Sequence, residues 1–266
     1  MPILLLVIIL GIVEGVTEYL PVSSTGHLIL ATELLGYDAD KWSLFNIAIQ
    51  PGAILAILVL YWRTFRDVLV GMWHRERSAW IFVRNLLVAF IPAVVIGLAI
   101  GDYIELLLGN AIVVAWALII GGFAILAVER FARPEYSGGV AEMSLRQSAM
   151  VGIVQCVAMV PGVSRSGANI LGAMGMGIDR RTAAEFSFFL AVPTLSGATA
   201  LQLYKHGAGI GDDMIGYILL GALVSFVVAI VVVKAFLAVI TRFGFGPFAW
   251  YRIAAGIAAL FWLAAR

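Results

Sequence analysis

The sequence predicts an all-α polytopic membrane protein, with six transmembrane helices and two re-entrant helical hairpins in an inverted-topology repeat. Three observations lead to this fold class: an apolar composition, six stretches long enough to cross a bilayer, and a polar segment that occurs twice. Hydrophobic residues make up 62% of the 266 residues and charged residues 12%, whereas soluble domains carry about 25% charged residues. We therefore interpret residues 1–266 as a single membrane domain.

Charge and cysteine content exclude some classes of function. The formal net charge is +1, and no basic run suggests a nucleic-acid partner. A lone cysteine, Cys156, excludes an internal disulfide. The apolar N-terminus lacks the basic region of a signal peptide and leads to Glu14 and Glu18, so we expect it to be retained.

A polar segment recurs at a constant offset in the two parts of the chain. Residues 11–28 read GIVEGVTEYLPVSSTGHL, and residues 152–169 read GIVQCVAMVPGVSRSGAN. Seven residues of the first copy recur 141 positions later: Gly11, Ile12, Val13, Val16, Val22, Ser23 and Gly26. Interrupted hydrophobic segments at corresponding points of two halves are typical of a binding site at the bilayer midplane. We assign the two repeats to residues 1–135 and 142–266.

The apolar stretches divide into full spans and broken segments. About 20 apolar residues are needed to cross a bilayer, and six stretches qualify: 44–62, 80–100, 111–129, 185–204, 214–240 and 247–265. The repeated segments, 2–36 and 144–178, each have two short apolar arms joined by a Pro, Gly and Ser hinge. Irregular backbone at membrane depth needs surrounding protein or water, which favours re-entrant hairpins. Each half then has one hairpin and three spans. Because three is an odd number, the second half should be inverted relative to the first, and the two hairpin tips should enter from opposite faces and meet.

The distribution of basic residues predicts the orientation. The loops 63–79, 130–147, 179–184 and 241–246 should share one side, and they hold Arg63, Arg66, Arg75, Arg77, Arg130, Arg133, Arg146, Arg180, Arg181 and Arg242. The opposite side holds Lys41, Lys205 and Arg266. Basic residues favour cytoplasmic loops, so both termini should be external. The external loops lean acidic through Asp38, Asp40, Asp102, Glu105, Asp212 and Asp213.

Arg165 is the basic residue that this layout places at membrane depth. Arg84, Lys234 and Arg252 should snorkel from the cytoplasmic ends of their spans, whereas Arg165 lies at the tip of the second hairpin. An intramembrane arginine is a functional candidate by default. The alternative is a structural ion pair with a buried carboxylate.

The residues around Arg165 are those of an anion-binding loop. Ser164 and Ser166 precede a helix expected to start near Gly167, and free N–H groups at a helix start bind phosphate. Gly162 and Gly167 let the backbone approach a ligand closely. A guanidinium adds a bidentate grip on phosphate oxygens.

Glu14 and Glu18 form a carboxylate pair on one face of the first arm, at i and i+4. Two carboxylates in an apolar site should share a proton or bind a cation. Mg²⁺ takes one or two carboxylates together with phosphate oxygens. The alternative is one neutral glutamic acid bonded to backbone. The second copy has Gln155 and Met159 at these positions, which predicts one composite site.

The first loop carries three hydroxyls and an imidazole. Ser23 and Thr25 could bind phosphate or cap the following helix. Ser24 aligns with Arg165 across the repeat, which favours Ser24 as a nucleophile or phosphate ligand. His27 follows the tip residue Gly26 and could act as a general acid, the alternative being a satisfied core histidine. Gln50, beside Pro51 and Gly52, lines the cavity or serves packing.

These groups together predict phosphoryl chemistry on a lipid. An anion cradle, an arginine, two carboxylates, a serine and a histidine are the parts that such chemistry needs, and the apolar walls favour a lipid-chain substrate. A rival interpretation is a transporter that carries a lipid phosphate without cleaving it. Another lipid-phosphatase plan needs a second catalytic histidine, but His74 and His206 fall in loops on opposite sides.

Two signature segments carry a resemblance to a known family. EGVTEYLPVSSTGH and PGVSRSGA closely resemble the signature segments of bacterial undecaprenyl-diphosphatases of the bacitracin-resistance type, and AIQPGAILAIL and AAEFSFFLAVPTLSGATAL are also similar. The resemblance runs from residue 8 to the C-terminus. It implies hydrolysis of undecaprenyl diphosphate to the monophosphate, which recycles the lipid carrier for peptidoglycan synthesis and confers bacitracin resistance.

The resemblance also implies a setting and roles for individual residues. It implies the bacterial inner membrane, a site open to the external leaflet, a divalent cation such as Mg²⁺ or Ca²⁺, and a lipid diphosphate and membrane lipid as partners; a homodimer is the candidate assembly. Glu14 and Glu18 match the E-x-x-x-E carboxylates, Ser24 and His27 the serine-histidine segment, and Arg165 the second-motif arginine. Asn169 departs from PGxSRSxxT, where threonine is usual, but retains a hydrogen-bonding group.

Overall fold

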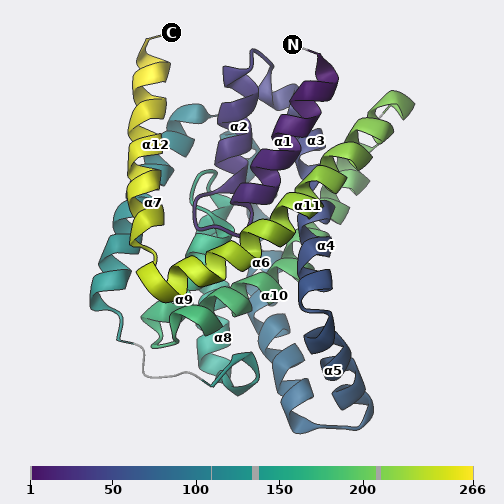
Figure 1. The fold of residues 1–266 in the computed structure, drawn as a ribbon, viewed down its shortest axis with the longest axis vertical. Helices are drawn as coiled ribbons and strands as arrows, with labels where there is room; N and C mark the ends of the chain where they lie inside the picture. The colour runs from purple at the N-terminus through teal and green to yellow at the C-terminus, as the bar shows by residue number, and fades with distance from the viewer. Residues whose placement is uncertain (1, 109, 134–137, 208–210, 266) are drawn as a thin grey trace.

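The computed structural model describes residues 2–108, 110–133, 138–207 and 211–265, and every regular element within them is a helix (Figure 1). The helices are α1 (Ile3–Thr17), α2 (Ser24–Leu34), α3 (Ala39–Ala48), α4 (Gln50–Leu60), α5 (Trp62–Trp73), α6 (Arg77–Leu108), α7 (Ala111–Phe131), α8 (Leu145–Gln155), α9 (Arg165–Gly175), α10 (Arg180–His206), α11 (Asp212–Phe243) and α12 (Gly246–Ala264), with short 3₁₀ helices η1 (Val140–Glu142) and η2 (Cys156–Met159). Arg266 and the side chains of Asp102, Glu105, Asp212 and Asp213 lie outside what the structure describes.

Within the described residues, six apolar helical stretches have the length and composition to cross a membrane, as the sequence predicted. They are Ala39–Leu60, Arg77–Gly101, Ala111–Phe131, Arg180–His206, Met214–Phe243 and Gly246–Ala264. The first is made of α3 and α4, which meet at Ile49 just before Pro51. A proline has no N–H to continue a helix, which explains the interruption there.

The prediction that residues 63–79 form a loop is wrong for most of the segment. Helix α5 runs through it to Trp73, and α6 begins at Arg77. The apolar residues Phe65 and Val68 are three positions apart and pack against the core, while Arg66 and Asp67 remain exposed and pair with each other. An amphipathic helix satisfies its own backbone while burying one face, which a loop of this composition could not do.

Helix α10 supplies much of the core. Ala183, Phe186 and Phe188 are fully buried, and Tyr19 from the first broken segment packs edge-on against Phe188.

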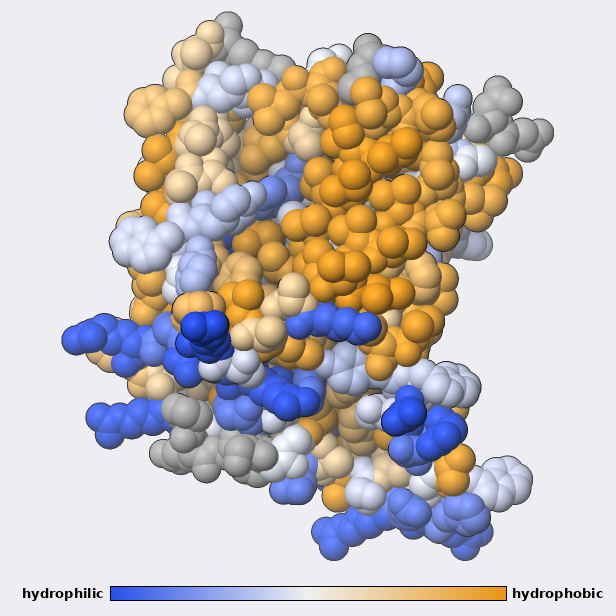
Figure 2. Space-filling view, in the orientation of Figure 1, coloured by the Kyte–Doolittle hydropathy of each residue, from blue (hydrophilic) through white to orange (hydrophobic). Residues whose placement is uncertain are grey.

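Figure 2 shows hydrophobic side chains over most of the upper face and hydrophilic ones gathered toward the lower end. Both termini lie at the upper end of Figure 1, opposite α5.

The two polar loops, residues 18–23 and 160–164, lead into α2 and α9 with the same backbone conformation. Ser23 has φ 74° and ψ 94°, and Ser164 has φ 78° and ψ 115°. Each serine hydroxyl accepts a hydrogen bond from the N–H three residues on, that of Gly26 at 3.3 Å and that of Gly167 at 3.1 Å. A positive φ is rare in residues other than glycine and often marks functional loops. The recurring serines and glycines thus have the same local role, and α9 starts two residues before the predicted Gly167.

The first arm of each broken segment packs on a long helix from the other half of the chain. Helix α1 packs along α11, and α8 packs along α6. A Cβ added at Gly11 would lie 2.7 Å from the Gly221 carbonyl oxygen, and one at Gly152 would lie 2.4 Å from that of Ala89. Gly11 and Gly152 correspond in the repeat, and small residues let membrane helices approach closely.

Replacing Gly152 with alanine is expected to destabilise the protein by about 1–3 kcal/mol, because the new methyl group would force α8 away from α6. The measurement is thermal unfolding of purified protein in detergent. Gly216→Ala is the matched control, since a Cβ there meets nothing within 4 Å. Equal melting temperatures for the two variants would contradict the close packing of α8 on α6.

Candidate active site

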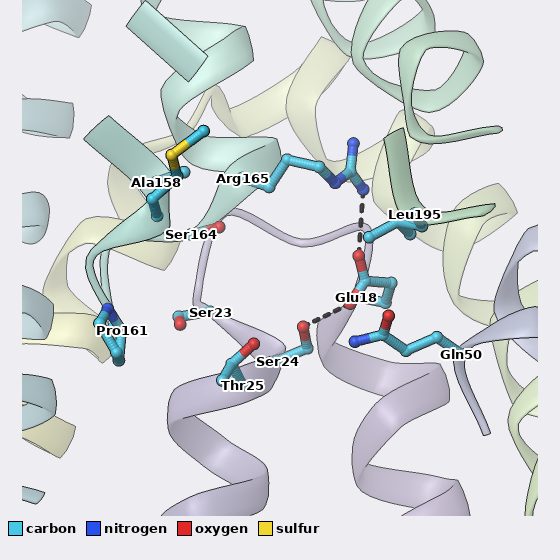
Figure 3. A pocket seen from close by; sticks show the side chains of 12 residues that line it. Glu18, Ser23, Ser24, Thr25, Gln50, Ala158, Pro161, Ser164, Arg165 and Leu195 are labelled. Atoms are coloured by element: carbon cyan, nitrogen blue, oxygen red, sulfur yellow. Dashed lines mark hydrogen bonds and ion pairs between the residues drawn. The ribbon is translucent and has the colours of Figure 1, made fainter. Parts of the chain in front are cut away.

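A pocket of about 180 Å³ lies where the two polar loops meet (Figure 3). It is lined by Glu18, Ser23, Ser24, Thr25, Gln50, Ala158, Met159, Pro161, Gly162, Ser164, Arg165 and Leu195. Eight of these residues are among the site residues predicted from the sequence. Seven come from the two copies of the repeated segment, and the eighth, Gln50, begins α4. The two loops therefore contribute to one cavity.

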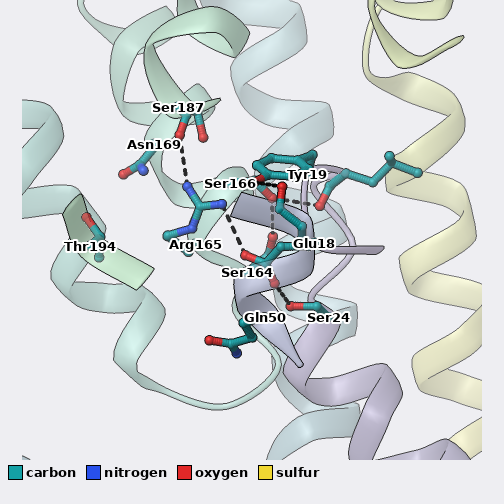
Figure 4. A network of polar contacts seen from close by, with 12 residues as sticks. Glu18, Tyr19, Ser24, Gln50, Ser164, Arg165, Ser166, Asn169, Ser187 and Thr194 are labelled. Atoms are coloured by element: carbon teal, nitrogen blue, oxygen red, sulfur yellow. Dashed lines mark hydrogen bonds and ion pairs between the residues drawn. The ribbon is translucent and has the colours of Figure 1, made fainter. Parts of the chain in front are cut away.

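Glu18 is the hub of the polar contacts in this pocket. Its Oε1 accepts a hydrogen bond from Nη2 of Arg165 at 3.1 Å, and its Oε2 accepts one from the hydroxyl of Ser24 (Figure 4). Ser24 and Arg165, which correspond in the repeat, thus bind the two oxygens of one carboxylate. The side chains of Glu18 and Arg165 are 3% and 10% exposed, so they form a buried ion pair.

The remaining donors of Arg165 show what holds the guanidinium in place. Nη1 donates to the carbonyl of Ser187 at 2.9 Å, which orients the group between α10 and Glu18. Nε has no hydrogen-bond partner among the described residues. A buried donor without a partner is unfavourable, so this N–H still needs an acceptor.

Glu14 lies one helical turn before Glu18, and its side chain is completely buried. Neither of its carboxylate oxygens has a hydrogen-bond partner in the described part of the chain. A buried carboxylate without a partner is strongly unfavourable unless it is protonated or bound to a cation. Glu14 and Glu18 therefore fit either a proton shared between the two carboxyl groups or the oxygen-ligand chemistry of Mg²⁺ or Ca²⁺.

Glu14 and Glu18 could not hold a cation by themselves. The described residues contain no group of three or more His, Cys, Asp or Glu side chains placed to bind a metal. Both oxygens of Glu18 are also engaged by Ser24 and Arg165. Phosphate oxygens and water would have to complete the coordination, which is the usual arrangement for Mg²⁺.

Several residues predicted to bind the ligand do not line the pocket. Ser166 donates to the carbonyl of Leu20 at 2.7 Å and lies 3.0 Å from the hydroxyl of Ser164, so it links the two loops. Asn169 is fully buried and donates to Gln155 at 3.0 Å. Together with Gly26 and Gly167, these residues are absent from the pocket lining. Their direct role in substrate binding stays a prediction.

His27 is also outside the lining of this pocket. Its Nδ1 lies 2.8 Å from the carbonyl oxygen of Ser23, and its Nε2 lies 2.7 Å from the hydroxyl of Tyr251. The two rings stack with centroids 5.5 Å apart. Both nitrogens are engaged, and the role of His27 as a general acid stays a prediction. No sequence signal pointed to Tyr251, which lies 224 residues away.

The prediction that Arg252 snorkels to the membrane surface is wrong. Arg252 is 1% exposed, and its guanidinium turns inward to backbone carbonyls of both polar loops. Helix α12 packs closely on α7, and the two loops cover Arg252. This residue therefore lies inside the protein and not at the membrane surface, although it is near the end of an apolar stretch. Arg165 is therefore not the only buried arginine.

The chain matches, over residues 7–258, the family described as Bacitracin resistance protein BacA. It is similar to proteins named undecaprenyl-diphosphatase from three bacteria. The identity is 58% to that of Novosphingobium aromaticivorans, with 97% of each chain covered. It is 55% to that of Rhizorhabdus wittichii, covering 99% of this chain and 98% of the relative, and 54% to that of Sphingopyxis alaskensis, with 97% of each covered. The chain belongs to the BacA family of bacitracin resistance proteins.

Proposed function

We propose that the protein is a membrane phosphatase that hydrolyses undecaprenyl diphosphate to undecaprenyl phosphate and inorganic phosphate. The name shared by its relatives supports the substrate. The observation that carries the proposal is the contact of Glu18 with both Ser24 and Arg165 in one pocket. A buried cation, a nucleophile and a carboxylate that can take its proton are the groups that phosphate cleavage requires.

The residues of the pocket, together with His27 outside its lining, carry out separate parts of the hydrolysis. Arg165 offers its free Nε–H to a phosphate oxygen and offsets the negative charge. Glu18 holds the Ser24 hydroxyl and can accept its proton as Ser24 Oγ, or a water in its place, attacks the terminal phosphorus. The bond from that phosphorus to the bridging oxygen breaks, and His27 protonates the departing lipid phosphate or relays the proton. With serine as nucleophile, water then cleaves a phosphoserine.

A divalent cation held by Glu14 and Glu18 would supply further neutralisation of the phosphate charge. Glu14 is the residue that depends most on this cation, because its carboxylate has no other partner among the described residues. Mg²⁺ and Ca²⁺ both suit carboxylate and phosphate oxygens.

We place the site at the midplane of the bacterial plasma membrane, between two re-entrant hairpins of an inverted repeat, with both termini external and the site opening to the external leaflet. The matched backbone of Ser23 and Ser164 supports the repeat. The packing of each first arm on the opposite half supports its inverted arrangement. The concentration of basic residues in the predicted cytoplasmic loops supports the orientation.

Phosphate release from a short prenyl diphosphate by the purified protein in detergent tests the proposed function. We expect release that falls at least about tenfold in EDTA and returns with Mg²⁺ or Ca²⁺, since charge neutralisation contributes several kcal/mol. Transport needs two compartments, so a lipid-phosphate transporter would release no phosphate in detergent. Release that is unaffected by EDTA would remove the cation from the mechanism but leave the phosphatase in place.

A further inference from the structure

Arg252 on α12 is almost completely buried, and its hydrogen-bond partners among the described residues are all backbone carbonyls. It makes five hydrogen bonds, which run to Pro21 at 2.9 Å, Gly162 at 2.9 Å, Val163 at 2.9 Å, Ala117 at 2.9 Å and Leu118 at 3.3 Å. Pro21 belongs to the first polar loop, Gly162 and Val163 belong to the second, and the other two belong to α7. One side chain therefore joins both loops to a membrane helix.

The chain is shaped to admit this guanidinium. A Cβ added at Gly121 on α7 would lie 2.0 Å from Nη2 of Arg252, so any larger residue there would collide with it. Nearby, Gly122 and Gly256 let α7 and α12 approach closely, since a Cβ would meet the carbonyl oxygens of Ala249 at 2.8 Å and Ala115 at 2.6 Å respectively. The close contact of the two helices brings Arg252 within reach of the loops.

The carbonyl partners of Arg252 in the two loops lie close in sequence to the proposed catalytic residues. Pro21 lies midway in sequence between Glu18 and Ser24, and Val163 is two residues before Arg165. Loop carbonyls at membrane depth need donors because lipid supplies none. The planar guanidinium has five N–H donors in a fixed geometry, whereas a lysine has three on a flexible stem.

We propose that Arg252 is a positioning residue that clamps the two loops together. It thereby fixes the positions of Ser24 and Glu18 relative to Arg165. This inference rests on the proposed function for its kinetic consequence, but not for its structural one. A displacement of about 1 Å in a catalytic arrangement can lower the rate about 10²-fold. Loosening the clamp therefore reduces turnover without removing any group that touches the substrate.

Arg252→Lys and Gly121→Ala test the clamp in two ways, by removing donors and by displacing the guanidinium. We expect kcat to fall about 10- to 100-fold in both variants, while KM for a prenyl diphosphate stays within about twofold because the apolar walls still hold the chain. Arg84→Lys, at a partly buried pair with Asn85, and Gly216→Ala are the matched controls and should retain wild-type kcat.

A double-mutant cycle distinguishes positioning from general stability. If Arg252 acts through the alignment of Arg165, then Arg252→Lys lowers kcat much less in an Arg165→Lys background than in the wild type. Two outcomes would overturn the proposal. One is that the two substitutions lower kcat by independent factors that multiply in the double variant. The other is that kcat falls only in proportion to the fraction of folded protein.

Hydrogen exchange supplies a readout that does not depend on phosphatase activity. In Arg252→Lys we expect faster amide exchange in residues 22–26 and 162–167 together, with the protection of α10 and α11 unchanged. Faster exchange throughout the protein, or in neither loop, would overturn the clamp. A wild-type protein that releases no phosphate would count against the proposed function alone, and the exchange result would still decide the role of Arg252.

Discussion

Replacing Arg165 with alanine is expected to lower kcat for prenyl diphosphate hydrolysis by about 10³-fold, the size of the loss when a preorganised donor to a developing oxyanion is removed. Arg165 is the cation in contact with Glu18 in the pocket, at 3.1 Å. Its removal would leave the buried Glu18 without a positive partner, one turn from Glu14, whose oxygens accept no hydrogen bond within the described residues. Breaking a buried ion pair from one side costs about 3–5 kcal/mol, so stability should fall as well.

Arg165→Lys separates the charge of this residue from its geometry. A lysine keeps the positive charge but cannot donate to Ser187 and Glu18 from two nitrogens held in one fixed plane. We expect an intermediate loss of kcat with stability closer to the wild type, measured by phosphate release and thermal unfolding. Arg181→Ala is the control, because this arginine is 68% exposed in its pair with Glu185. An Arg165→Ala protein with more than about a tenth of wild-type turnover would refute this role.

Replacing Ser24 with alanine should abolish phosphate release while sparing substrate binding. The Ser24 hydroxyl donates to a carboxylate that can accept its proton, which is the arrangement of an activated nucleophile. Losing a nucleophile lowers kcat by about 10⁶-fold in a well-studied serine hydrolase. A methylene-bridged prenyl diphosphonate, which has no bridging oxygen to cleave, should bind the variant with an affinity within about threefold of the wild type.

The same variant decides between serine and water as the attacking group. Mass spectrometry of wild-type protein quenched during turnover should find phosphate on Ser24. Thr25→Val is a matched control, since Thr25 also lines the pocket and follows Ser24 in the first turn of α2. If Ser24→Ala retains a tenth or more of wild-type turnover and no phosphoserine is trapped, then water is the nucleophile and Ser24 only orients the phosphate.

The predicted spans agreed with the structure because membrane crossing depends on local properties of the chain. Length and apolar composition are readable within a window of about 20 residues, and all six predicted stretches correspond to apolar helical stretches long enough to cross a membrane. The same reasoning failed for α5, whose charged residues resemble a loop by composition. Its helix is stabilised by packing Phe65 and Val68 on the core, and this contact is not local in sequence.

The composite pocket was also predictable in outline. Repetition of the polar segment indicated that Ser24 and Arg165 should face each other, and both contact Glu18. The sequence could not indicate that Ser166 binds the carbonyl of Leu20, or that His27 is bound by Tyr251. Such contacts depend on side-chain directions at the point where separate helices meet.

Taken alone, the chain determined its long apolar helical stretches, its two matched loops and the polar residues at their tips. These features follow from periodicity, composition and the conformations that serine and glycine adopt locally. Only the folded arrangement decided the partners: a carboxylate shared by residues from opposite halves, and an arginine from the last helix donating to both loops. The physical reason is that hydrogen bonds and close packing act over about 3 Å, whereas Pro21 and Arg252 are 231 positions apart along the chain.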